Sequence, residues 1–168
     1  IWNIKKYQKW ILFQSFHRIY FYNIDTEEIN YLTDFNNYYR IFEIDAVIYI
    51  FKKDGALVKL ENGKEVLITV FPEIYNVKLV LNIFKIDNNY LVLTRSEGFF
   101  LIENGIVKKW DAPINKEFKK DQIFCGIRLK DNSFMLGTIS NGVLHISSKG
   151  EVINRINQTV GLTNNTVL

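Results

Sequence analysis

Cysteine, proline and long hydrophobic runs are all scarce in this 168-residue chain. Cys125 is the single cysteine, so the chain can form no internal disulfide, and one thiol does not identify a redox compartment. The longest clean apolar run is 46–51, far short of the roughly 20 residues that a membrane helix requires. Segment 1–10 has no basic stretch leading into an apolar one, as a signal peptide would. We therefore expect no membrane contact by this segment, and the lack of an initial Met indicates a piece of a longer protein.

The sequence also lacks an excess of charge of one sign and the common catalytic or metal-binding motifs. It has 21 basic and 18 acidic residues, which gives no reason to expect nucleic acid as a partner. There is no HxH, HExxH, CxxC or G-x-S-x-G pattern and no glycine-rich phosphate loop. We predict no cofactor, no metal and no catalytic residue in this segment.

Glycine is infrequent but regularly spaced. Gly98 lies 43 residues after Gly55, and Gly142 lies 44 residues after Gly98. Each is followed, seven or eight residues later, by a second polar-Gly pair: Asn62-Gly63, Asn104-Gly105 and Lys149-Gly150. Asn-Gly and Asp-Gly pairs favour type I′ hairpin turns, because both central residues of that turn need a positive φ. Short apolar segments separate the turns, so each period reads as a series of antiparallel strands.

A period of about 43 residues with four short strands is typical of a β-propeller blade. The second strands, such as 46–51, are almost wholly apolar, whereas the fourth, such as 151–157, are polar, as expected of an outer edge. The first repeat lacks the glycines and is assigned from spacing alone, with turns at 17–18 and 25–26. We predict an all-β chain of four consecutive four-stranded antiparallel blades, spanning residues 1–33, 34–70, 71–119 and 120–160, with 161–168 opening the next blade.

These four blades are predicted to form an incomplete arc of a larger propeller of about seven blades. A closed four-bladed propeller and a β-sandwich with many hairpins are the alternatives. A sandwich gives no reason for two turn pairs to recur in phase three times.

The C-terminal repeat resembles the two-component regulator propeller repeats found in the sensor region of Bacteroidetes hybrid histidine kinases. The resemblance covers about 35 residues, and three elements carry it: a Gly-Thr pair, two glycine turns and a closing "GL-x-x-N-x-V" motif. The matching residues are Gly137-Thr138, Asn141-Gly142-Val143, Lys149-Gly150, Gly161-Leu162, Asn165 and Val167. The first three repeats keep the rhythm but lack the Gly-Thr core and the closing motif.

This resemblance implies a non-catalytic sensor segment that lies in the periplasm and detects an oligosaccharide. It also implies a parent protein with a membrane helix and a histidine kinase, acting as a homodimer. A propeller-based polysaccharide lyase or glycosidase is the main alternative, and a protein-interaction scaffold is another. An enzyme of that kind would need acidic, His or Tyr side chains gathered on one face, and the sequence shows no clear set.

Several single residues invite a chemical role but have a simpler explanation. His145 lies within an apolar strand and is predicted to be satisfied by a cross-strand partner or solvent, while His17 is a surface turn residue. Cys125 is expected to be a buried, inert thiol. The recurring turn carboxylates are expected to bind backbone amides rather than calcium. They are Asp45, Asp54, Asp87 and Asp131.

Two aromatic clusters fall at joints between repeats, in segments 34–40 and 71–76. Joint loops open on a propeller face, and aromatic rings beside amides and a guanidinium suit sugar recognition. The candidate ligand-binding residues are therefore Tyr38, Tyr39, Arg40, Tyr75 and Asn76. Packing within the joint is the alternative role for these side chains.

Overall fold

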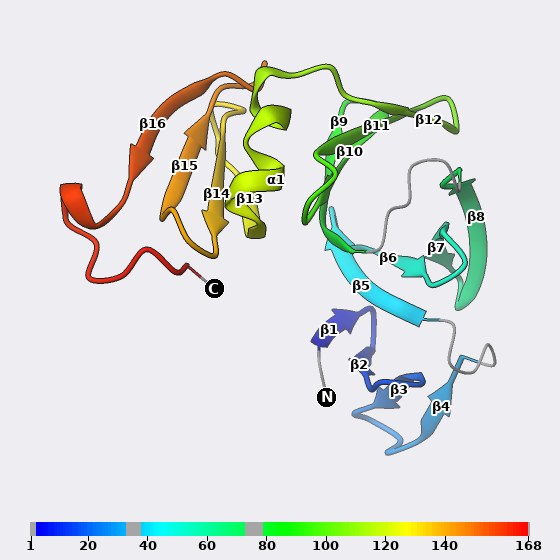
Figure 1. Cartoon of the computed structure of the whole chain (residues 1–168). Coiled ribbons are helices and arrows are strands. Elements are labelled where there is room, and N and C mark those ends of the chain that lie inside the picture. Colours follow the sequence, from blue (N-terminus) through cyan, green and yellow to red (C-terminus); the bar gives the residue numbers. More distant parts are fainter. Residues whose placement is uncertain (1–2, 33–37, 73–78, 168) are drawn as a thin grey trace. The chain divides into compact units, whose positions relative to one another are not determined.

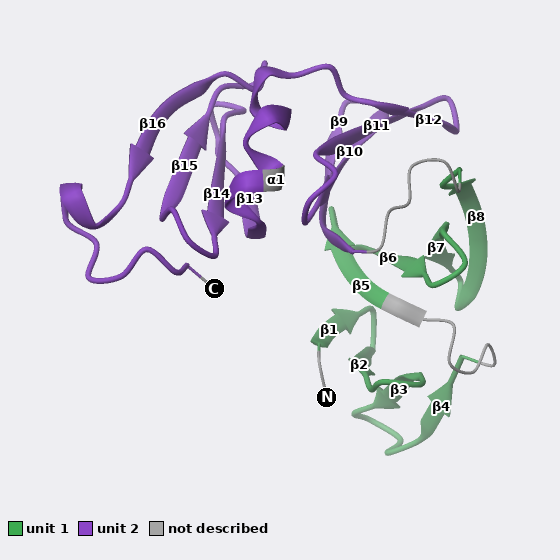
Figure 2. Ribbon diagram, in the orientation of Figure 1, with its two compact units in different colours: residues 1–74 green, residues 75–168 purple. Residues whose placement is uncertain are grey.

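The computed structural model describes residues 3–32, 38–72 and 79–167, which consist almost entirely of antiparallel strands. These residues form four sheets of four strands each, and strands consecutive in the chain are neighbours in the sheet (Figure 1). This order confirms the predicted all-β fold of four consecutive four-stranded antiparallel blades. The chain divides into two compact units, residues 1–74 and 75–168, with two sheets in each (Figure 2).

The first unit contains the first two sheets. The strands of its first sheet are β1 (Asn3–Tyr7), β2 (Trp10–Gln14), β3 (Ile19–Asn23) and β4 (Ile29–Tyr31). Those of its second sheet are β5 (Tyr38–Ile44), β6 (Val47–Lys52), β7 (Ala56–Glu61) and β8 (Lys64–Val70). One hydrophobic core joins the two sheets, since buried residues such as Leu12 and Ile48 belong to the same cluster. An amide also links their first strands, because Asn3 Nδ2 donates to the Ile41 carbonyl at 2.9 Å.

The second unit contains the third and fourth sheets. The strands of its first sheet are β9 (Val80–Ile86), β10 (Asn89–Thr94), β11 (Phe99–Glu103) and β12 (Ile106–Lys109). Those of its second sheet are β13 (Ile123–Arg128), β14 (Phe134–Thr138), β15 (Val143–Ile146) and β16 (Val152–Ile156). The rings of Phe84 and Phe134, one from each sheet, lie 5.1 Å apart at their centroids. The first strands are linked as in the first unit, with Asn82 Nδ2 donating to the Gly126 carbonyl at 2.9 Å.

Burial follows the predicted position of each strand in its blade. The second strands β6, β10 and β14 are largely buried, whereas β4, β12 and β16 are mostly exposed. The first repeat, assigned from spacing alone, also forms a four-strand meander. The apolar interior of each unit therefore lies between its two sheets, and the outer strands face solvent.

The glycine turns are of two kinds, and only one was predicted. Asn62-Gly63 and Asn104-Gly105 have positive φ at both residues, as the type I′ turn requires. At Gly55, Gly98 and Gly142 only the glycine has a positive φ, because each ends a loop of three or four residues instead of a two-residue turn. The type I′ prediction is wrong at these three positions and at Lys149-Gly150, where again only the glycine has a positive φ, although the glycines are still needed for their left-handed conformation.

A short helical segment, which the strand pattern did not predict, joins the two sheets of the second unit. It comprises η2 (Pro113–Lys116) and α1 (Phe118–Asp121). Ile114 and Phe118 have no exposed surface, and Phe118 makes an edge contact with Phe99 at 5.5 Å between ring centroids. The segment thus contributes apolar side chains to the core that the two sheets share.

Candidate functional site

Most of the predicted ligand residues lie where their side chains are not described. Tyr75 and Asn76 are outside the described residues, and for Tyr38 and Tyr39 only the backbone, at the start of β5, is described. Arg40 is half-buried, with its guanidinium carbon 5.9 Å from the centroid of the Phe42 ring. A sugar site at the joints therefore stays a prediction.

A pocket of about 390 Å³ lies in the first unit, at one end of its first sheet. Its lining comes from the β1–β2 turn, from β3 and β4, and from the β7–β8 turn of the neighbouring sheet. The lining residues are Tyr7, Gln8, Trp10, Phe21, Asn30, Tyr31, Leu32, Asn62 and Gly63. This volume is within the range of about 300–1,000 Å³ that is typical of small-molecule sites.

The pocket is aromatic in its deeper part and carries amides at its rim. Tyr7 and Phe21 are buried, and Trp10 is half-buried, with its ring edge-on to Phe21 at 6.4 Å. Asn30 and Asn62 are exposed. Among the residues that the structure describes, the lining contains no Asp, Glu, Lys, Arg or His, so these residues offer ring surfaces and neutral hydrogen-bonding groups.

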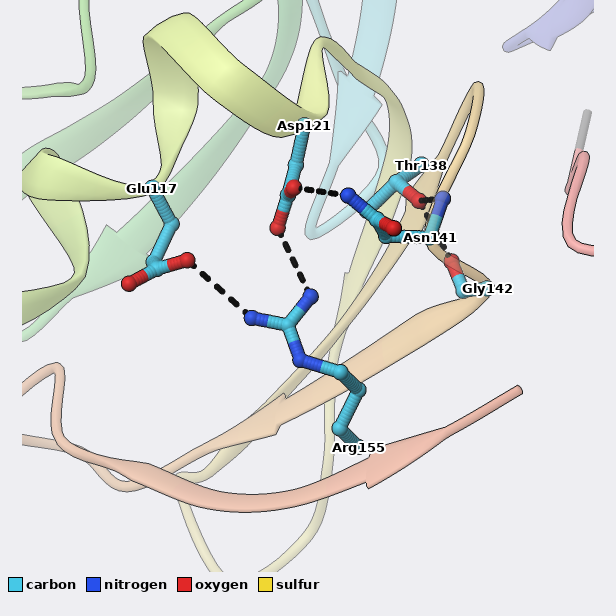
Figure 3. A network of polar contacts seen from close by, with 6 residues as sticks. All are labelled: Glu117, Asp121, Thr138, Asn141, Gly142 and Arg155. Atoms are coloured by element: carbon cyan, nitrogen blue, oxygen red, sulfur yellow. Dashed lines mark hydrogen bonds and ion pairs between the residues drawn. The ribbon is translucent and has the colours of Figure 1, made fainter. Parts of the chain in front are cut away.

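A polar network in the second unit joins α1 to the fourth sheet (Figure 3). The Asp121 side chain has no exposed surface, and its Oδ2 accepts from Arg155 Nη1 at 2.8 Å. Its Oδ1 accepts a short hydrogen bond from Asn141 Nδ2. Arg155 also donates to Glu117 Oε2 at 3.1 Å. The hydrogen bond to Asp121 raises the pKa of Arg155 above its usual value.

The bonds of this network all join one part of the fold to another. Both oxygens of the Asp121 carboxylate accept N–H donors from within the protein, and the side chain has no exposed surface. The network connects three elements that are distant in the sequence: the joint helix, the β14–β15 loop and the outermost strand β16. Its consequence is a fixed position for β16, which otherwise pairs only along one edge.

The residues that carry the family resemblance meet in space at this same blade. Val167 N donates to the Thr138 carbonyl at 2.9 Å, and Gly142 N donates to the Asn165 carbonyl at 2.7 Å. A Cβ on Gly137 would lie 3.0 Å from Val167 Cγ1, so the small residue makes room for the returning chain. The spaced motif therefore describes a closure between the loops of one blade and the segment that follows it.

His145 has the ordinary role that its strand position predicted. Its Nε2 lies 3.0 Å from Ser133 Oγ, and Ser133 Oγ donates to Asp131 Oδ1 at 2.6 Å. The bonds from Ser133 hold the pKa of Asp131 below its usual value. Since the Ser133 hydroxyl donates to the carboxylate, it does not give its proton to the histidine, as a serine nucleophile would have to do.

The turn carboxylates Asp54 and Asp131 bind backbone amides two residues on, at 3.0 Å in each case, which confirms the turn interpretation for these two. Cys125 differs from the prediction, because its side chain is half-buried rather than buried. Neighbouring side chains of a strand point to opposite faces, and Gly126 faces Leu93 of the adjoining sheet, so Cys125 faces away from it.

Within residues 3–32, 38–72 and 79–167, no three His, Cys, Asp or Glu side chains gather in a way that could hold a metal ion. The helices in the same part of the chain are too short to cross a membrane.

The chain resembles several solved structures over almost its whole length. One is the extracellular domain of BT4673 from B. thetaiotaomicron, described as a one-component system and also as a hybrid two-component system. That match has a TM-score of 0.69 and 17% identity, and it covers 98% of this chain and 24% of the other. A second is the extracellular domain of BT3049 from B. thetaiotaomicron, described as a hybrid two-component system. That match has a TM-score of 0.63 and 19% identity, and it covers 98% of this chain and 23% of the other. BamB from Moraxella catarrhalis matches with a TM-score of 0.59 and 12% identity, and the match covers 95% of this chain and 50% of the other.

Identities this low establish the fold alone. The chain spans about a quarter of the length of the two extracellular domains that it matches. No family model and no curated protein matches the sequence.

Sequence reasoning missed both the aromatic pocket and the buried ion pair. The predicted ligand residues all lie at joints between repeats, whereas the pocket takes Trp10 and Tyr31 from strands. The Asn62-Gly63 turn was predicted, but the sequence does not show that this turn lies next to the first sheet, where it lines the pocket. Asp121 and Arg155 are 34 residues apart, and no local pattern pairs them.

Proposed function

We propose that this chain is a non-catalytic, ligand-binding part of the extracellular sensor region of a two-component regulatory protein. The supporting observation is the likeness of 98% of the chain to extracellular domains described in those terms, with TM-scores of 0.63 to 0.69. The resemblance of the C-terminal repeat to regulator propeller repeats points the same way, and it is independent of the superposition. In this role the four blades are consecutive members of a larger propeller.

The ligand of this sensor is an oligosaccharide. Aromatic rings beside neutral amides suit sugars, because C–H faces of a pyranose pack on rings while hydroxyls need fixed donors and acceptors. The first unit supplies both kinds of group within one pocket. A sensor also needs a stiff platform, and cores shared between paired sheets give each unit that property.

The parent protein places this region in the periplasm as a homodimer, outside an inner-membrane anchor and a cytoplasmic kinase. Binding would act by favouring one arrangement of the dimer over another, which requires a different affinity for each arrangement. The sequence of the parent gene tests this architecture directly. A membrane helix and a kinase downstream are expected, and a secretion signal with a stop codon after the propeller would overturn the sensor assignment.

Ligand binding is tested separately, by calorimetry of the intact ectodomain against a broad panel of glycans. We expect saturable binding of at least one oligosaccharide without turnover. Absence of heat across the panel would contradict sugar sensing, and hydrolysis or elimination of a bound glycan by the purified protein would favour a lyase or glycosidase instead.

A further inference from the structure

We propose that the pocket between the β1–β2 turn and the β7–β8 turn binds an uncharged sugar unit of the ligand. Trp10 would provide the stacking surface, and Asn30 and Asn62 would bind hydroxyls. This inference rests on the proposed sugar-sensing function, and it adds a site and a class of sugar that the function alone does not specify. The site lies entirely in the first unit, whereas the motif that carries the family resemblance belongs to the second.

The gradation of burial across the pocket favours a ligand with an apolar face. Tyr7 and Phe21 are 5% and 8% exposed, so they form a fixed floor held by an edge contact between the two rings at 6.4 Å. Trp10 is half-buried and packs against the core of the unit, and Tyr31 is 51% exposed. A ring that is anchored yet partly open loses little entropy when a ligand packs on it.

The rim offers the second requirement of sugar binding, which is paired donors and acceptors. Gln8, Asn30 and Asn62 all carry primary amides, each with two N–H donors and one carbonyl oxygen. Hydroxyl groups both donate and accept, so such amides can satisfy them in either role. The three amides come from three separate parts of the chain, which are the β1–β2 turn, β4 and the β7–β8 turn.

The described lining residues are all uncharged, which favours neutral sugars. A uronic acid or sulfated sugar would have to place its charge against aromatic and amide groups without a cationic lining residue. Two cations do lie nearby, but over the rings: Lys9 Nζ is 5.6 Å from the Trp10 centroid, and the Arg18 guanidinium carbon is 4.3 Å from that of Tyr31. These contacts help to orient the two rings and do not line the pocket.

A proline-rich peptide is the other common ligand of aromatic grooves. Such peptides present backbone carbonyls that accept hydrogen bonds but few N–H donors, whereas sugar hydroxyls both donate and accept, as the amides of the rim do. The amide-bearing rim thus favours the sugar, and a peptide is included in the test as a competing outcome.

The test is calorimetric titration of the complete chain with maltose, cellobiose, mannobiose and xylobiose, and with digalacturonate as the acidic counterpart. Two variants probe the site. Trp10→Ala removes the stacking ring, and Asn62→Gly removes an amide while keeping the turn, since Asn62 has a φ of 51° that glycine adopts freely. Phe16→Ala, an exposed aromatic of the β2–β3 loop that does not line the pocket, is the matched control.

We expect a neutral disaccharide to bind, Trp10→Ala and Asn62→Gly each to weaken binding about tenfold, and Phe16→Ala to leave it unchanged. Because Trp10 also packs on the core, Asn62→Gly keeps the test informative should Trp10→Ala fold poorly. Sugar binding that neither folded variant weakens would overturn this site while leaving the proposed function intact. Preference for digalacturonate or for a proline-rich peptide would overturn the assignment of an uncharged sugar.

Discussion

Arg155 Nη1 lies 2.8 Å from Oδ2 of Asp121, a carboxylate with no exposed surface, so a charged group on the outermost strand is paired with a buried one on the joint helix (Figure 3). Replacing Arg155 by Met leaves Asn141 as the remaining partner of that carboxylate within this network. Breaking a fully buried pair costs about 3–5 kcal/mol, and since the Arg155 side chain is 30% exposed we expect a loss of about 2 kcal/mol. Urea unfolding measures this loss as a lower midpoint.

Lys108→Met is the matched control for the loss of a cation. Lys108 pairs with Glu103 at 2.6 Å, but the two side chains are 52% and 45% exposed. Removing an exposed pair of this kind should change the stability by less than about 0.5 kcal/mol. Equal effects of the two substitutions would show that burial of Asp121 contributes nothing to the strength of its ion pair.

Thr94 and Thr138 occupy equivalent places in the third and fourth sheets. The hydroxyl of each donates to a loop glycine carbonyl four residues on, at 2.6 Å for Thr94 and 2.9 Å for Thr138. Each also accepts a backbone N–H from the residue three positions on. Valine keeps the shape but loses both bonds, so either substitution should lower the free energy of unfolding by about 1–2 kcal/mol.

Exposed Thr26 serves as the control, because its hydroxyl bonds only the nearby Glu28 carboxylate. Thr26→Val should have little effect on thermal unfolding. A large loss for Thr138→Val with none for Thr94→Val would mean that the two loops are not equivalent, contrary to their shared hydrogen-bond pattern.

The periodicity of turns was enough to predict four sheets, because glycine and asparagine in left-handed positions report directly on the backbone. The alternation of apolar second strands with polar fourth strands likewise predicted which strands are buried. Segment 113–121 escaped prediction, since four residues of 3₁₀ helix and four of α-helix are too short to show a helical period. The turn type at Gly142 was also predicted wrongly. The type of a turn depends on the length of its loop, which is set by where the two flanking strands stop pairing, and the sequence does not show that point.

The candidate sites were harder to predict for a different physical reason. The pocket forms where two neighbouring blades pack together. Asn62 is part of its lining because the β7–β8 turn lies beside the first sheet, a contact that the sequence does not reveal. The resemblance, in contrast, was informative because Gly137 and Val167 must pack together, a constraint that leaves a mark on spacing.

Asn82 links neighbouring blades of the second unit by donating from Nδ2 to the Gly126 carbonyl at 2.9 Å, while its Oδ1 accepts from Ile83 N. Asn82→Ala removes the link between sheets and should cost about 1–2 kcal/mol in urea unfolding. Asn154→Ala is the matched control, because Asn154 makes the same local bond to the next backbone N–H from the exposed strand β16. We expect Asn154→Ala to cost clearly less, and the reverse order would contradict a linking role.

Gly142 and Gly63 have almost the same backbone conformation, with φ of 76° and 75°, but different surroundings. A Cβ on Gly63 meets nothing within 4 Å, so Gly63→Ala should cost only the strain of a left-handed alanine, about 1–2 kcal/mol. A Cβ on Gly142 would collide with the Ile156 carbonyl oxygen and touch Asn157 Cα at 3.0 Å, so backbone of β16 must move. Gly142→Ala should therefore cost at least about 2 kcal/mol more.

Hydrogen exchange read by mass spectrometry separates the two effects, since it follows β8 and β16 individually in each variant. Gly142→Ala should speed exchange along β15 and β16, whereas Gly63→Ala should change exchange only near its own turn. Equal losses of stability in the two variants would show that β16 moves aside at little cost, and that the close approach of Gly142 to the end of β16 does not hold the outer edge of the last blade.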